Sequence, residues 1–237
     1  MAQRSLIVSI HIPKTGGMSF EQTLAAHFGD RLLRDDEDRP ANASPLQRRW
    51  RALWRGLATG LAAGRYRRLD CVHGHFLAER WRLLGRRRPV RFVTWLRDPV
   101  TRLASHYHYW RRSYDPATAL ALHRRVVEEE WSFERFALGP ELRDLSAEFL
   151  WRLPREQLAF VGLMERFDSD HARFCRQLLG REIAAPSANA NPELSFGGSG
   201  SEPYAAEEAL RGQIEAHHDR DTALYRWALE ASHGWRS

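Results

Sequence analysis

The 237-residue sequence has little or none of several features that define whole classes of protein. Its two cysteines, Cys71 and Cys175, are too few for a disulfide framework. It has no internal repeat and no apolar run of transmembrane length, and an apolar strand-like run begins at residue 6. We therefore expect a cytoplasmic protein without a signal peptide or a membrane span. With 43% hydrophobic residues, residues 1–237 can form one domain around a substantial core.

Basic residues outnumber acidic ones, 36 to 30, and nearly all of the basic residues are arginine. The net charge of +6 suits an anionic ligand, such as a nucleotide with several phosphates. Arginine-rich stretches at 48–68 and 80–91 could face an acidic glycan or could be ordinary solvated surface. The sequence contains no nucleic-acid recognition motif, so we expect no nucleic-acid partner.

The most informative segment joins a buried strand, predicted at residues 6–10, to a helix that carries Phe20, Leu24 and Phe28 on one face. Glycines in such a connection let the backbone approach a phosphate, and the helix N-terminus attracts the anion. A lysine adds positive charge. The segment predicted to bind an anion therefore comprises Pro13, Lys14, Thr15, Gly16, Gly17, Met18, Ser19 and Phe20. In a Walker A loop the lysine follows the glycines, whereas here it precedes them.

A second strand-to-helix connection is predicted around residue 97. Residues 90–96 read as a buried strand, Asp98 is a good N-cap, and Pro99 suits the first helical position. The residues expected on the buried face of this helix are Val100, Leu103, Ala104 and Tyr107.

The same connection offers a second anion site. Arg97 stands at the end of the strand and Ser105 two turns into the helix, so the two side chains could bracket one anion. Arg102 is predicted on the exposed face of this helix.

Two histidines, His73 and His75, lie two residues apart after a short apolar stretch and share a face if the segment is extended. Such a pair can be half of a metal site, but the sequence offers no convincing third ligand, so no metal is expected. An imidazole near neutral pH is also suited to act as a general base.

Taken together, these motifs resemble those of the carbohydrate sulfotransferases that use 3′-phosphoadenosine 5′-phosphosulfate (PAPS), in particular the heparan sulfate 2-O- and 6-O-sulfotransferases. The three motifs are Pro-Lys-Thr-Gly-Gly-x-Ser, His-Gly-His and Arg-Asp-Pro-Val-x-Arg, in that order along the chain. The resemblance implies that residues 13–20 bind the 5′-phosphosulfate and that Arg97 and Ser105 bind the 3′-phosphate. It further implies that His75 is the general base, that His73 orients it or shares its role, and that Lys14 stabilises the leaving phosphate.

Weaker similarity to the same family extends toward the C-terminus, at residues 160–167, 189–192 and 221–225. Position 18 departs from the pattern, because relatives often have threonine where this chain has Met18. Residues 184–203 are expected to form a loop, and in relatives this region lies over the nucleotide.

Strands that alternate with helical patterns predict an α/β fold with a central parallel sheet flanked by helices. The resemblance implies a P-loop-like, three-layer version of it. Residues 34–68 are expected to form an insertion or lid, residues 115–150 two helices, and residues 205–231 one closing helix.

The function implied by the resemblance is transfer of the sulfuryl group of PAPS to a hydroxyl of a carbohydrate, a glycolipid or a small acceptor, with PAP as product. Two other classes remain open. A P-loop kinase or nucleotide hydrolase would require Mg²⁺. A non-catalytic module that binds polyanions would leave the His-Gly-His segment without a purpose.

Overall fold

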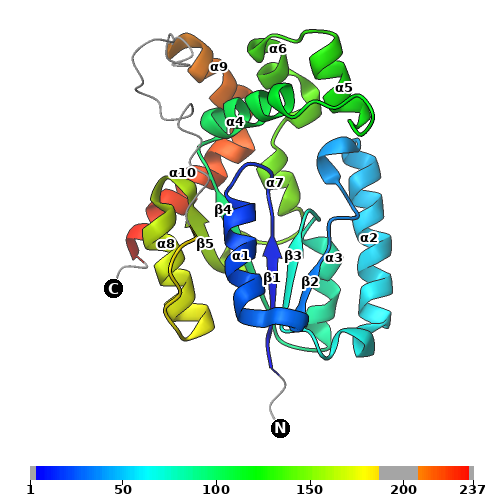
Figure 1. Ribbon diagram of the computed structural model, residues 1–237, viewed down its shortest axis with the longest axis vertical. Coiled ribbons are helices and arrows are strands. Elements are labelled where there is room, and N and C mark those ends of the chain that lie inside the picture. The colour runs from blue at the N-terminus through cyan, green and yellow to red at the C-terminus, as the bar shows by residue number, and fades with distance from the viewer. Residues whose placement is uncertain (1–3, 187–207, 235–237) are drawn as a thin grey trace.

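Five strands form one parallel sheet at the centre of the computed structural model, which describes residues 4–186 and 208–234 (Figure 1). The strands are β1 (Leu6–Ile10), β2 (Leu32–Arg34), β3 (Cys71–Gly74), β4 (Val90–Leu96) and β5 (Leu158–Leu163). They pair in parallel in the order β2-β3-β1-β4-β5. The predicted α/β class with a central parallel sheet is confirmed, and so are the strands predicted at residues 6–10 and 90–96.

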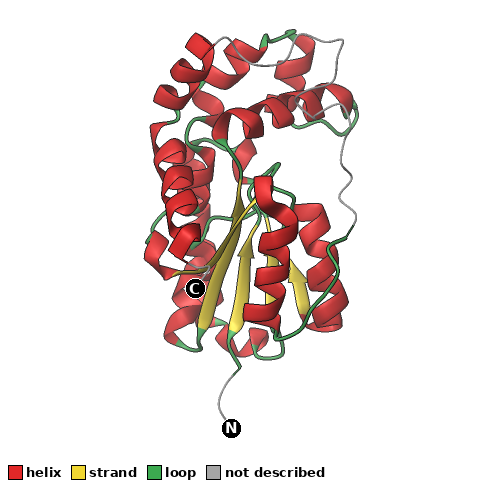
Figure 2. Ribbon diagram, turned by 90° about the vertical axis from the view of Figure 1, so that its left-hand side faces the viewer, coloured by secondary structure: helices red, strands yellow, loops and turns green. Residues whose placement is uncertain are grey.

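Helices cover both faces of this sheet (Figures 1 and 2). The α-helices are α1 (Gly17–Phe28), α2 (Pro45–Leu61), α3 (Glu79–Arg82), α4 (Pro99–Arg112), α5 (Ala121–Glu128), α6 (Phe133–Leu138), α7 (Leu145–Phe149), α8 (Phe167–Phe174), α9 (Glu208–His217) and α10 (Asp219–Gly234). A π-helical stretch, Cys175–Leu179, continues α8. In the described residues, no helix is both long and apolar enough to cross a membrane.

The three layers arise because successive side chains along a strand point to opposite faces of the sheet. Leu6, Val8 and Ile10 join one core with residues of α3, α4, α7 and α10, whereas Ile7 joins a second core with residues of α1 and α8. All five residues of β1 are buried, which is why four of the five are apolar and the strand does not alternate between apolar and polar residues. The sheet is therefore enclosed on both faces, and ligands can reach it only at its ends.

Two expected helical regions are divided differently from the prediction. Residues 115–150 contain three α-helices, α5, α6 and α7, where two were expected. The closing helix expected at 205–231 is two helices, α9 and α10, within its described part. Local periodicity finds the helical residues but does not locate the bend at His218, whose ring bonds backbone groups of the segment 137–144.

The segment 34–68 contains the connection from β2 to β3, and α2 forms most of it. Its acidic residues bond to neighbouring elements: Asp35 to Arg80 of α3, and Asp38 to Arg55 of α2. This segment thus passes beside β3 before the chain enters the sheet again.

The carboxyl ends of parallel strands lie at one edge of the sheet, where such folds bind ligands. The connections that follow β1, β3 and β4 carry the three sequence motifs, so the fold brings all three motifs to this edge.

Candidate active site

The connection between β1 and α1, which was predicted to bind an anion, turns sharply and leads into a helix without a side-chain cap. Lys14 and Gly16 both have positive φ angles, 70° and 74°, which turn the backbone sharply before the helix begins. No side chain caps the N-terminus of α1, and its first turn contains no acidic residue. The backbone N–H groups and the positive end of the helix dipole are thus left without a side-chain acceptor.

Thr15 stabilises this loop from within. Its side chain is buried, and its hydroxyl donates to the carbonyl of Ile12 at 2.9 Å. Because this bond uses its only hydroxyl proton, Thr15 can offer a ligand its backbone amide. Ser19 lines the adjacent pocket, whereas the side chain of Met18 is 65% exposed.

Lys14 is the only lysine of the chain. Its Nζ lies 3.8 Å from the ring centroid of Tyr109 on α4, so the ammonium packs on an aromatic face. Burial, followed by the positive charges of Arg112 and Arg97, lowers the pKa of Lys14 to about 8. The neighbouring charges that lower this pKa are arginines, so several cations lie close together here. Such a cluster of positive charge favours binding of a polyanion.

Arg97 follows β4 directly and stands just before α4. Asp98 caps α4 as predicted, accepting the N–H of Thr101 at 2.9 Å. Arg97 makes no ion pair with another described residue. Burial lowers its pKa, and the charges of Glu165 and Asp98 partly offset that effect. Ser105 lies two turns into α4 and is buried.

Arg102 corrects a prediction, because it is fully buried and not on an exposed face. Its Nη2 lies 3.6 Å from a carboxylate oxygen of Asp221 on α10. The same carboxylate accepts the backbone N–H groups of Ser146 and Ala147 in α7. The C-terminal helix, α10, covers a second face of α4. The hydrophobic pattern of α4 alone does not indicate that this second face is buried.

Three histidine rings stack at the carboxyl ends of β1 and β3. The ring of His11 lies 5.0 Å from that of His73 and 4.1 Å from that of His75, centroid to centroid. Burial, together with the neighbouring histidines, lowers the pKa of His11 well below its usual value. Gly17 at the start of α1 allows this arrangement, because a Cβ at that position would overlap the His11 ring.

The two predicted histidines differ in their surroundings. His73 is 2% exposed, and its Nδ1 lies 2.8 Å from the hydroxyl of Ser9. Burial lowers the pKa of His73 to about 3, so this ring stays neutral across the physiological range. His75 is only partly buried, and burial lowers its pKa less severely, opposed by the charge of Asp36.

Hydrogen bonds also determine the tautomer of His75. Its Nδ1 lies 2.7 Å from the backbone carbonyl of His11, and a carbonyl can only accept. Nδ1 therefore carries the proton, which leaves the lone pair on Nε2, as a general base requires. The backbone N–H of His75 donates to Asp36 at 2.9 Å and holds the residue in place.

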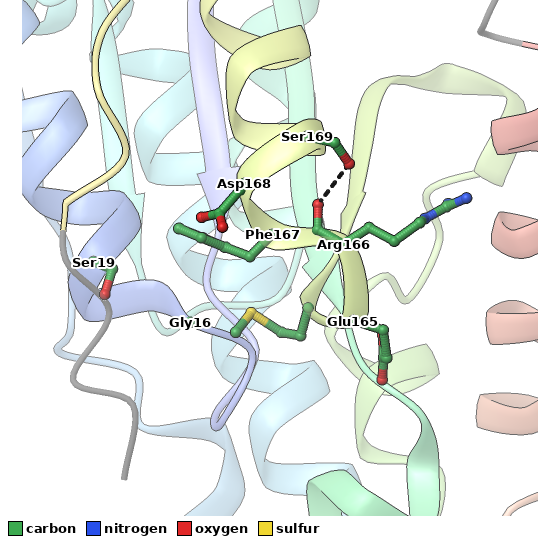
Figure 3. A pocket seen from close by; sticks show the side chains of 8 residues that line it. Gly16, Ser19, Glu165, Arg166, Phe167, Asp168 and Ser169 are labelled. Carbon is green, nitrogen blue, oxygen red and sulfur yellow. Dashed lines mark hydrogen bonds between the residues drawn. The ribbon is translucent and has the colours of Figure 1, made fainter. Parts of the chain in front are cut away.

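A pocket of about 460 Å³ opens beside the predicted anion loop, residues 13–20 (Figure 3). Gly16 and Ser19 line one side, and Phe167 and Asp168 of α8 line the other. This pocket lies toward β5, whereas the stacked histidines lie toward β3, on the other side of β1 in the sheet. The loop thus lies between this pocket on one side and the three stacked histidines on the other.

Sequence reasoning did not assign roles to His11, Asp36 or Tyr109, although each contacts a predicted site residue. The only signal for Asp36 in the sequence is that it belongs to an acidic run at residues 35–38. No group of residues suited to hold a metal ion occurs in the described part of the chain. The motif at 189–192 lies outside the described residues.

No protein-family model matches the sequence, and no curated protein matches it. A sulfotransferase from Alicyclobacillus acidocaldarius is similar in structure, with 18% identity over 99% of both chains and a TM-score of 0.47. Mouse sulfotransferase SULT7A1, solved in complex with PAP, is 12% identical over 98% of this chain and 90% of that chain, with a TM-score of 0.41.

Proposed function

We propose that the protein is a PAPS-dependent sulfotransferase that transfers a sulfuryl group to a hydroxyl of an acceptor. The observation that carries the proposal is a juxtaposition at one sheet edge. An uncapped helix N-terminus, the cations Lys14 and Arg97, and a histidine with its Nε2 lone pair available all lie there. The order of the three motifs along the chain supports the choice of PAPS among polyanionic ligands.

The residues present fit a nucleotide with two phosphate groups. The loop at 13–19 and Lys14 would hold the 5′-phosphosulfate, with backbone amides and the dipole of α1 as further donors. Arg97 and Ser105 would hold the 3′-phosphate, since arginine offers a planar fork for phosphate oxygens. The pocket lined by Phe167 is adjacent to this loop and has room for the nucleoside.

When bound, PAPS supplies the sulfuryl group, and PAP is released. The acceptor oxygen forms the new bond to sulfur while the bond from sulfur to the phosphate oxygen breaks. In this mechanism His75 takes the hydroxyl proton on Nε2, because its Nδ1 proton is held by the carbonyl of His11. Lys14 and the loop amides stabilise the charge that develops on the leaving phosphate. His73 acts through its neighbours, since it is buried and packed against the His11 ring.

The acceptor is proposed to be a carbohydrate or a glycolipid, on the strength of the motif resemblance. It would approach from the histidine side of the loop, opposite the pocket that Phe167 and Asp168 line. A P-loop kinase is the second candidate, but the lysine position relative to the glycines speaks against it.

Calorimetric titration of PAP into the purified protein, without metal, tests the proposal. We expect micromolar binding of PAP and much weaker binding of ATP, followed by label transfer from PAPS to a hydroxyl-bearing acceptor. ATP turnover in the presence of magnesium would favour the kinase. Salt-sensitive binding of polyanions without binding of PAP would favour a non-catalytic module.

A further inference from the structure

The outer face of α2 is apolar, although α2 lies at the edge of the molecule (Figure 1). Five large side chains on this helix are between 47% and 80% exposed: Leu46, Trp50, Trp54, Leu57 and Leu61. Their spacing of three or four residues places them on one face, which we call the α2 stripe. The other large hydrophobic residues exposed in the described chain, Met18 and Tyr109, both belong to the candidate site.

The α2 stripe contributes nothing to the core, because α2 packs by its opposite face. That face carries small or polar residues, with Ala52, Gly56 and Thr59 buried. It packs against α3 and the following 3₁₀ turn, Leu83–Arg86. At Gly56 a Cβ would collide with the backbone oxygen of Glu79, so the two segments are in close contact. Packing within the protein therefore does not explain why each stripe position carries a large apolar residue.

Positive charge surrounds the stripe. Residues 39–69 include eight arginines and no acidic residue. Three of the eight are paired with acids from other segments: Arg48 and Arg49 with Glu148, and Arg55 with Asp38. The other five are exposed and form no ion pair with any other described residue: Arg39, Arg51, Arg65, Arg67 and Arg68.

The charge continues beyond α2 into the segment that packs on it. Arg86 and Arg87 are exposed at the end of the 3₁₀ turn that contacts α2. In the same stretch, Arg80 and Arg82 are paired with acids, and Arg88 bonds backbone carbonyls. Exposed arginines of both arginine-rich stretches thus follow or pack near the C-terminal end of α2: Arg65, Arg67 and Arg68 from one stretch, and Arg86 and Arg87 from the other.

We propose that α2 docks the protein on the surface of an anionic lipid membrane. The stripe would lie among the headgroups, where tryptophan is well suited because its ring is amphipathic, and the arginines would contact lipid phosphates. A helix with leucine and tryptophan on one face and unpaired arginines beside it has the composition of helices that lie in the membrane interface. The inference is independent of the proposed function, since no residue of the active site takes part.

Charge complementarity favours a membrane over a second copy of the chain. A second α2 would cover the apolar stripe, but it would add the same arginines and no carboxylate from residues 39–69. An anionic lipid surface covers the stripe and supplies the opposite charge at the same time.

Vesicle co-sedimentation tests this inference with the intact protein. We expect binding to vesicles with about 30% phosphatidylglycerol in phosphatidylcholine, and little binding to phosphatidylcholine alone. Binding should weaken when salt is raised from about 0.1 M to 0.5 M. The double variant Trp50→Ser/Trp54→Ser should bind at least ~10-fold more weakly while keeping its far-ultraviolet circular dichroism and melting temperature.

Two triple variants that remove the same number of charges distinguish a membrane site at α2 from a general electrostatic attraction between the protein and the vesicles. The triple variant Arg51→Gln/Arg67→Gln/Arg68→Gln should lose roughly fivefold in partitioning per arginine, on the order of 100-fold in total. The control removes three exposed arginines from other elements: Arg124→Gln, Arg135→Gln and Arg226→Gln. The control should bind within about twofold of the wild type.

Three outcomes would overturn the proposal. The first is no binding of the wild type to the anionic vesicles at low salt. The second is equal losses in the two triple variants. The third is concentration-dependent dimerisation in sedimentation experiments that Trp50→Ser/Trp54→Ser abolishes, which would identify a second copy as the occupant. Lys14→Ala should bind vesicles like the wild type, so a failure of the proposed enzymatic function would leave this result unchanged.

Discussion

The titration of Lys14 gives a direct test of the electrostatics of the anion site. Burial and the charges of Arg112 and Arg97 lower the pKa of this lysine from 10.5 to about 8. With that pKa, roughly 90% of the side chain is charged at pH 7 and roughly 10% at pH 9. With the ordinary value, the charged fraction would still be about 97% at pH 9.

The sequence makes this measurement unusually simple, because the chain has no other lysine. Protein grown with lysine carrying ¹³C at Cε should give one side-chain resonance, and its shift can be followed against pH. We expect a midpoint near pH 8. A midpoint near 10.5 would refute the reasoning, because it would mean that neither burial nor the nearby arginines acts on the ammonium.

The same titration predicts how ligand binding depends on pH. If PAP binds only the charged form of Lys14, its dissociation constant should rise by roughly tenfold between pH 7 and pH 9. Binding of the anion should in turn shift the lysine midpoint upward, because the bound phosphate favours the ammonium. Lys14→Arg stays charged throughout, so the pH dependence over this range should vanish in that variant. A wild-type dissociation constant that is flat to pH 9 would contradict a role for Lys14 in binding.

Three further predictions concern the histidines, the buried arginine and the helix start. His75→Ala should lower kcat by roughly 10²–10⁴-fold and leave PAP binding unchanged, measured by label transfer and calorimetry. Asp221→Asn should cost about 3–5 kcal/mol in urea unfolding, because it leaves the guanidinium of Arg102 buried without its counter-charge. Gly17→Ala should lower kcat/KM by roughly 10²-fold by displacing the stacked imidazoles, whereas Gly64→Ala, in open space, should have no effect.

Each of these predictions has an outcome that contradicts it. Full activity of His75→Ala combined with His73→Ala would remove the general base from the mechanism. An unfolding midpoint unchanged by Asp221→Asn would mean that the buried pair contributes little. Equal kinetics in Gly17→Ala and Gly64→Ala would show that the position of the His11 ring does not matter.

Local signals were sufficient for the elements that position the predicted anion site. The strands at 6–10 and 90–96 were predicted with the bounds that the structure has, because each is a largely apolar segment that is followed by a polar turn. The start of α4 at Pro99 was predicted from the Asp98 cap, which acts over three residues. Such features depend on residues that are neighbours in the chain, so the sequence alone determines them.

Arg102 shows where local reasoning stops. The apolar residues of α4 indicated one buried face correctly, but α4 has a second buried face, which α10 covers. The partner that stabilises Arg102 lies more than a hundred residues away, and no periodicity within α4 encodes its presence. The same limit applies to α2, whose apolar face would be assigned to the core by pattern and lies outside it.

By itself, then, the sequence determined the strand-to-helix connections, and it indicated the predicted anion loop with its single lysine and the candidate histidines. Tertiary structure alone decided the strand order β2-β3-β1-β4-β5, which places β3 beside β1. That pairing stacks His11 on His73 and His75 and gives His75 the carbonyl that sets its tautomer. The physical reason is that a hydrogen bond or a ring contact depends on distance in space, and these partners are more than sixty residues apart along the chain.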